Sequence, residues 1–215
     1  MDLQRYEALR AAGYNRIPLV KEILADLDTP LSVYLKLAHA PHSFLLESVE
    51  GGETWGRYSM IGLPAAAVIT VRDGVCMVKS RHGEERLEGN DPFAAIESFR
   101  RRFRVPELPD LPRFSGGLVG YFSHDSVGYI EPSLAETGGD DALGCPEVCL
   151  LLAEELVVFD NLRGTVQLLV HAHADETDGY YAAQRRLEEL AARLRAPLSY
   201  PSFKGYAGSV AGEFT

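Results

Sequence analysis

Two apolar segments with a very short connection constrain the fold more than any other feature of this sequence. Residues 148–159 and 165–172 are almost continuously hydrophobic, and only the stretch DNLRG separates them. Such a connection joins antiparallel strands as a hairpin, whereas parallel strands need a crossover of about a dozen residues or more. A strand that is apolar on both faces lies inside a sheet. We therefore predict a central antiparallel hairpin in which residues 148–159 form one strand.

Shorter strands and several helices complete the predicted architecture. Further strands are expected at 17–24 (an edge strand), 44–49, 58–61, 66–72 and 75–80. Thr29-Pro30 and Asp91-Pro92 each place a capping residue before a proline that suits a first helical turn. An apolar stripe with helical spacing also runs over residues 178–195. Hairpin connections with few helices predict an α+β fold, a largely antiparallel sheet flanked by helices.

The composition excludes several classes of partner. The chain has 215 residues and is 46% hydrophobic, enough for a sizeable core in one large domain or a domain and a half. Its 21 basic and 31 acidic residues give a net charge of −10, so we expect neither nucleic acid nor an anionic membrane surface as a partner. The apolar runs are too short to span a bilayer and the start lacks a secretion signal, so we expect a cytoplasmic protein. Its 3 cysteines, an odd number at low density, are predicted to be free thiols.

Polar side chains interrupt an apolar strand in residues 44–62, FLLESVEGGETWGRYSMIG. Strand positions usually hold β-branched or aromatic residues, so Glu47 and Ser48 beside apolar neighbours suggest a bound ligand. The Glu47 carboxylate can meet an ammonium group, and the planar Arg57 guanidinium can meet a carboxylate. The segment therefore suits a small zwitterion. An internal ion pair between Glu47 and Arg57 explains the same residues, and the sequence leaves both interpretations open.

Glycines and histidines elsewhere are interpreted as structural. Gly116, Gly117 and Gly120 are expected to serve backbone geometry, because the lysine and hydroxyl of a phosphate-binding loop are missing. His171 and His173 would share one face of a strand and could chelate a metal. Without a third ligand in view, we predict instead that both are solvated at the end of the strand.

Two further charged groups receive structural interpretations. Adjacent residues of a strand face opposite sides, so His124 and Asp125 are not expected to act as an acid-base pair. The basic stretch at 100–104, RRRFR, is predicted to be the solvated end of a helix, where cations complement the helix dipole.

Three motifs together resemble the N-terminal domain of anthranilate synthase component I: LLES at 45–48, WGRYSMIG at 55–62 and FSGGLVGYFSHDSVGYIE at 114–131. The resemblance covers nearly the whole chain, in order. It implies a β-sandwich-like α+β domain over residues 1–196 that forms, with a catalytic domain, the pocket for the feedback inhibitor L-tryptophan. Carried over by motif, the tryptophan-binding residues are Leu46, Glu47, Ser48, Arg57, Tyr58 and Ser59. His124 and Gly128 depart from the Tyr and Arg common in the family, which leaves open the contacts of residues 114–131 with another domain or subunit.

The resemblance also implies a parent enzyme. That enzyme is a lyase that converts chorismate to anthranilate and pyruvate, with ammonia from a glutamine amidotransferase subunit (component II). Residues 197–215 would then link to a chorismate-binding catalytic domain that holds Mg²⁺ and that this sequence does not contain. We accordingly expect no catalytic residues, metal or other cofactor and no activity in this chain alone, and the end at Thr215 looks like a truncation. Two alternatives stay open: the corresponding domain of aminodeoxychorismate synthase component I, or a non-catalytic interaction module.

Overall fold

The computed structural model describes residues 1–24, 28–47, 57–89, 91–131, 133–134 and 144–198. The helices are α1 (Leu3–Ala11), α2 (Pro30–Val33), α3 (Pro92–Arg100) and α4 (Gly179–Arg195), with a π-helical turn at Tyr34–Ala38 and a 3-10 helix at His124–Tyr129. The strands are β1 (Arg16–Leu24), β2 (Phe44–Glu47), β3 (Tyr58–Gly62), β4 (Ala67–Arg72), β5 (Val75–Ser80), β6 (Gly83–Arg86), β7 (Gly117–Phe122), β8 (Val148–Ala153), β9 (Glu155–Asp160) and β10 (Thr165–His173).

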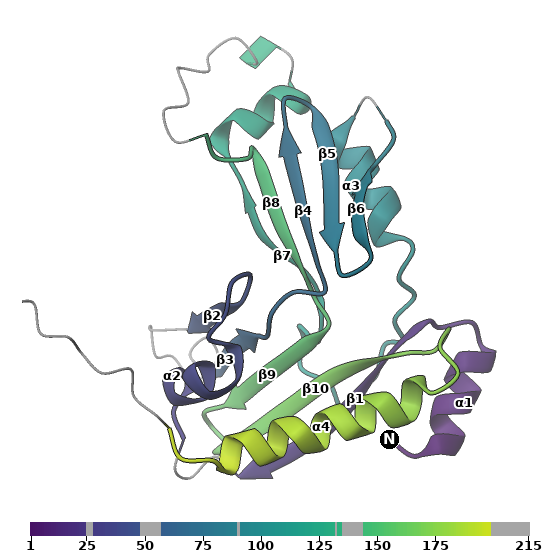
Figure 1. Ribbon diagram of the computed structural model, residues 1–215, viewed down its shortest axis with the longest axis vertical. Coiled ribbons are helices and arrows are strands. Elements are labelled where there is room, and N and C mark those ends of the chain that lie inside the picture. The colour runs from purple at the N-terminus through teal and green to yellow at the C-terminus, as the bar shows by residue number, and fades with distance from the viewer. Residues whose placement is uncertain (25–27, 48–56, 90, 132, 135–143, 199–215) are drawn as a thin grey trace, which may run out of the picture.

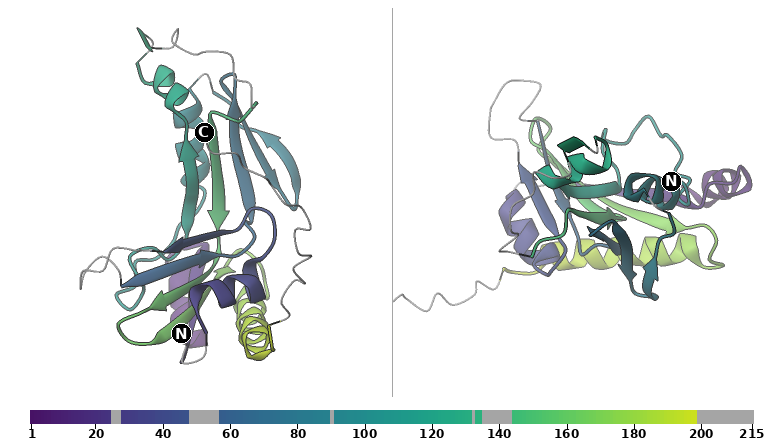
Figure 2. Two further views of the ribbon diagram at one scale, coloured as in Figure 1. Left: turned by 90° about the vertical axis from the view of Figure 1, so that its left-hand side faces the viewer. Right: turned by 90° about the horizontal axis from the view of Figure 1, so that it is seen from above.

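The strands form two antiparallel sheets of 5 strands each. The first has the order β1-β10-β9-β3-β2, and the second has the order β6-β5-β4-β8-β7. Helix α4 lies along the first sheet and α3 lies beside the second (Figure 1). The strands of the second sheet follow the long axis of the molecule, while those of the first run across it (Figure 2). This arrangement confirms the predicted α+β class, with largely antiparallel, sandwich-like sheets and flanking helices.

The chain passes from the second sheet to the first at Glu154. Strand β8 pairs with β4 and β7, whereas β9 pairs with β10 and β3. The prediction of one strand over 148–159 was therefore wrong, although each half does lie between two neighbours in its sheet. The break has a physical cause, because the Glu154 side chain is turned to polar partners on the first sheet and so interrupts the apolar run.

Each sheet has its own apolar core. The larger cluster joins the first sheet to α4, α1 and the helical segment after residue 29, and Ile61, Leu168 and Leu190 are completely buried within it. A second cluster joins the second sheet to α3 through Ile96 and Phe99. A smaller cluster covers the other face of the first sheet, where Leu156, Val158 and Leu169 pack against side chains such as Tyr58, Met60 and Phe114.

The local signals for turns and helix starts are confirmed. Asp73 and Gly74 both have positive φ, 49° and 72°, as a tight hairpin turn between β4 and β5 requires. Thr29 caps α2 in a reciprocal arrangement with Ser32, and the Asp91 carboxylate accepts a bond from the Phe93 amide at the start of α3. None of the helices in the described part of the chain has the length and apolar character needed to cross a membrane.

Candidate functional site

The predicted ligand-binding segment begins on β2, an edge strand of the first sheet. Glu47 is the last residue of β2 and lies directly across from Ser59 on β3, while Leu46 lies across from Met60. Glu47 is exposed and the Leu46 residue is 50% exposed, whereas Ser59 is only 3% exposed. Ser48, the remaining residue of the LLES motif, lies outside the described residues. At the edge of the sheet, the exposed Glu47 therefore lies across from the buried Ser59.

The predicted residues are divided between the two faces of this sheet. Directly paired residues of an antiparallel sheet point to the same side, so Glu47 and Ser59 share one face. Tyr58 and Met60 pack into the smaller cluster on the opposite face, which Leu46 also shares through its pairing with Met60. The predicted residues therefore do not all face the same side of the sheet.

Arg57 has a partner that the sequence did not predict. Its Nε donates to the two carboxylate oxygens of Asp160 at 2.9 and 3.0 Å, and its Nη2 also bonds this carboxylate. The guanidinium carbon lies 4.9 Å from the centroid of the Tyr58 ring, in cation–π geometry. The hydrogen bonds from Arg57 hold the pKa of Asp160 below its usual value, against the opposing effect of burial. The charged partner of Arg57 is therefore Asp160, not Glu47.

The turn that follows β9 contacts both Arg57 and Ser59. The Asn161 amide N–H donates to the Arg57 carbonyl at 2.8 Å, and Asn161 Nδ2 donates to Ser59 Oγ at 3.4 Å. Asp160 and Asn161 belong to the DNLRG stretch, which the sequence analysis used only as a hairpin connection. Its signal was the pair of polar side chains directly after an apolar strand, but spacing along the chain does not show that they face residues 57–59.

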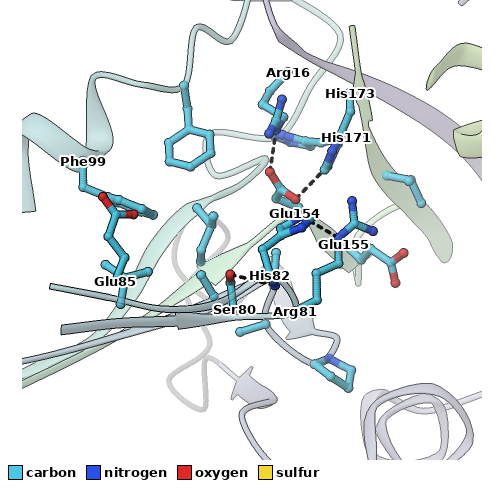
Figure 3. Close-up of a pocket in the computed structure, with 18 residues that line it drawn as sticks. Arg16, Ser80, Arg81, His82, Glu85, Phe99, Glu154, Glu155, His171 and His173 are labelled. Atoms are coloured by element: carbon cyan, nitrogen blue, oxygen red, sulfur yellow. Dashed lines mark hydrogen bonds and ion pairs between the residues drawn. The ribbon is translucent and has the colours of Figure 1, made fainter. Parts of the chain in front are cut away.

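A second candidate is a cavity of about 460 Å³ at the junction of the two sheets (Figure 3). Glu154 lies at its centre, and its two carboxylate oxygens accept bonds from Arg16 Nε at 2.8 Å and from His173 Nε2 at 2.9 Å. Burial opposes ionisation of Glu154, but the bonds from His173 and Arg16 prevail and lower its pKa.

The two histidines of β10 were wrongly predicted to be solvated. His171 is 7% exposed, and its Nε2 donates to the Ser115 carbonyl at 2.6 Å. Burial lowers the pKa of His171, so the ring is held in its neutral form. His173 reaches Glu154 instead. Both side chains point back into the junction, because β10 continues past the point where the chain crosses between sheets.

The charged groups that line the junction cavity are paired within the chain. Arg81 meets Glu176 at 3.2 Å, Glu85 meets Arg102 at 2.7 Å and Glu155 meets Arg186 at 2.8 Å. Among the residues that the structure describes, no group of three or more His, Cys, Asp or Glu side chains could hold a metal ion. Internal pairing of this kind favours a structural role for the junction.

The remaining charged groups agree with their structural interpretations. Arg100 and Arg101 bond Glu97 and are well exposed, as expected at a solvated helix end. His124 and Asp125 lie in the 3-10 helix after β7, not in a strand, and His124 Nδ1 lies 3.9 Å from Asp125 Oδ1 with both side chains exposed. Cys76, Cys145 and Cys149 are free thiols.

Comparison with known proteins gives a consistent result. No family model matches the chain. Over 200 residues it is 51% identical to anthranilate synthase component 1 of Pseudomonas aeruginosa, with 93% of this chain and 41% of the relative covered. The protein of the same name from Neisseria gonorrhoeae is 48% identical over 98% of this chain and 44% of the relative. The chain thus spans less than half the length of these relatives.

A solved structure supports the fold. The crystal structure of anthranilate synthase component I from Streptococcus pneumoniae matches 81% of this chain and 37% of its own, with a TM-score of 0.54 at 21% identity. Sequence similarity over nearly all of the chain, together with the same fold, identifies the chain as a member of the anthranilate synthase component I family that corresponds to the N-terminal region of these proteins.

Proposed function

We propose that this chain is the tryptophan-binding, feedback-regulatory part of an anthranilate synthase component I. The whole protein would convert chorismate, with ammonia that component II releases from glutamine, to anthranilate and pyruvate. The names of the relatives favour this reaction over the synthesis of aminodeoxychorismate. A regulatory role agrees with the internal pairing of the junction charges, which leaves no evident acid-base set there.

One observation carries the proposal: Glu47 stands exposed at the end of an edge strand, opposite the Ser59 hydroxyl. A carboxylate so placed can bind the ammonium group of an amino acid, and the buried Ser59 hydroxyl, which accepts a bond from Asn161, lies on the same face. Leu46 and Tyr58 offer apolar and aromatic surface on the other face. A ligand held at the end of β2 can contact both sets.

The described residues do not fit the Mg²⁺ of the proposed reaction. They contain no group of three or more potential metal-binding side chains, so we assign the metal and the chemistry to other parts of the whole protein. Tryptophan would act on that chemistry through a coupling free energy between two sites, which is typically about 1–3 kcal/mol.

A calorimetric titration of the chain with L-tryptophan tests the proposal. We expect saturable binding that Glu47→Ala weakens at least tenfold, because the ammonium group loses its counter-charge. Glu22→Ala is the matched control, since Glu22 is exposed on β1, the opposite edge of the same sheet. It should bind as the wild type does. Absence of heat at millimolar tryptophan, where binding would contribute only about −4 kcal/mol, would contradict the proposal that this chain itself carries the binding site.

A further inference from the structure

The Asp160 carboxylate is held in one position by several hydrogen bonds. It is the last residue of β9, and its side chain is 10% exposed. Besides the bonds from Arg57, its Oδ1 accepts the backbone amides of Leu162 at 3.1 Å and Arg163 at 3.2 Å. Backbone amides of the following turn fix the position of this carboxylate independently of Arg57. The carboxylate can therefore set the orientation of the Arg57 guanidinium.

The bonds to Asp160 leave part of Arg57 available. Asp160 takes the edge formed by Nε and Nη2, and within the described residues Nη1 has no hydrogen-bond partner. Guanidinium groups have five donors in a rigid fork, so one carboxylate can hold one edge while another binds the other. The Arg57 side chain is 29% exposed, which gives a ligand access to it.

We infer that Asp160 is a positioning residue of the ligand site, which holds Arg57 so that its remaining edge meets the carboxylate of the bound amino acid. This inference rests on the proposed function and adds the turn after β9 to the site. Asn161 of that turn bonds Ser59 and also the Arg57 backbone, so the same turn steadies two of the predicted binding residues. Asp160 acts through Arg57 and does not touch the ligand.

The alternative is a purely structural ion pair, and the chain provides a matched control for it. Glu155, the first residue of β9, holds Arg186 by bonds of 2.8 Å from both Nε and Nη2. The two pairs have similar geometry and lie at opposite ends of one strand. Loss of either pair should lower stability, but only loss of the Asp160 pair should change ligand affinity.

The test measures L-tryptophan affinity and unfolding free energy for the wild type, Asp160→Asn and Glu155→Gln. Asparagine keeps an oxygen for the amides of the turn but removes the charge that holds Arg57. We expect affinity to fall about tenfold in Asp160→Asn and to stay unchanged in Glu155→Gln. If Asp160→Asn does not fold, Asp160→Glu takes its place: it displaces the charge that holds Arg57, so the affinity should fall, and an unchanged affinity would overturn the role of Asp160.

A ligand-independent measurement accompanies the titration. In the wild type the Arg57 Nε–H should give an NMR signal protected from solvent exchange, and Asp160→Asn should remove that protection. In an Arg57→Ala background, Asp160→Asn should cause no further loss of affinity, because its effect passes through Arg57.

The outcomes separate the two proposals. Wild-type binding with undiminished affinity in Asp160→Asn would overturn the role of Asp160 and leave the proposed function intact. Equal weakening by Asp160→Asn and Glu155→Gln would assign the effect to general stability and also overturn it. If the wild type binds no tryptophan, the proposed function fails and this inference fails with it.

Discussion

Two positions in or next to β7, 116 and 120, require glycine because neighbouring atoms leave no room for a Cβ atom. A Cβ added to Gly120 would lie 1.9 Å from the Cys149 carbonyl oxygen, so the backbones of β7 and β8 approach too closely for any side chain. Gly116 has a φ of 142°, and its Cβ would lie 2.6 Å from the His171 ring. The sequence-based expectation that these glycines serve backbone geometry is confirmed, and His171 explains why it is needed at 116.

Gly120→Ala should therefore destabilise the protein. The new methyl group meets backbone atoms, which cannot rotate away, so β7 must separate from β8. We expect a loss of about 3 kcal/mol in the free energy of unfolding, measured by urea denaturation. Val119→Ala is the control on the same strand: it removes part of a half-buried side chain and should cost about 1 kcal/mol. Equal losses in the two variants would contradict the steric argument.

The candidate site shows why residue identities were easier to predict than residue partners. The sequence singled out Glu47 and Arg57 because charges are unusual beside an apolar strand. It could not pair Arg57 with Asp160, or Arg16 with Glu154, because those partners are 103 and 138 positions apart and meet only through the sheet order. The same holds for His171, whose burial depends on the distant segment at Ser115.

At the scale of helices and strands, local sequence signals were sufficient to predict where helices begin and where a hairpin turns. Thr29 and Asp91 start helices as predicted, and Asp73-Gly74 makes its hairpin. The division at Glu154 was missed, because the prediction treated residues 148–159 as one apolar strand although Glu154 and Glu155 lie within it. At Glu154 the chain leaves the sheet of β4 and β7 and enters the sheet of β10 and β3. Hydrophobicity along the chain does not show which strands will be neighbours.

Helix α3 provides a test of these local signals. The Asp91 side chain accepts the Phe93 amide at 2.9 Å, and the buried Ile96 and Phe99 attach the helix to the second sheet. Asp91→Ala should lower the free energy of unfolding by about 1 kcal/mol, as loss of a helix cap usually does. Asp91→Ser keeps an oxygen acceptor and should restore most of the loss. A serine variant as unstable as the alanine variant would indicate that the carboxylate acts by charge and not as a cap.

At the scale of the whole molecule, the junction links the two sheets through buried titratable groups. Glu154 lies where the chain crosses, Arg16 and His173 hold it from the first sheet, and His171 ties β10 to the segment before β7. The response of these groups to acid follows from their pKa shifts. Burial lowers the pKa of His171. Burial alone would raise the pKa of Glu154, but the bonds from His173 and Arg16 outweigh it, and the pKa is lowered.

The signs of these shifts define two pH windows. The unfolded chain takes up a proton at His171 below its ordinary pKa of about 6.5, whereas the folded protein resists protonation there, so stability falls as pH drops below that value. The slope from one such proton is at most about 1.4 kcal/mol per pH unit. The carboxylates of Glu154 and Asp160 contribute their full stabilisation above about pH 4, and they lose it as pH falls through their lowered folded values.

His171→Gln separates the two windows. The glutamine amide can still donate to the Ser115 carbonyl but does not titrate, so the contribution of His171 to the slope between about pH 7 and pH 5 should disappear. The carboxylate window below about pH 4 should remain, because Glu154 and Asp160 are unchanged. Urea denaturation at half-unit pH intervals measures both. An unaltered slope in the upper window would show that His171 is not held neutral by its burial, whereas a flat upper window would make this one ring the main acid-sensitive link between the two sheets.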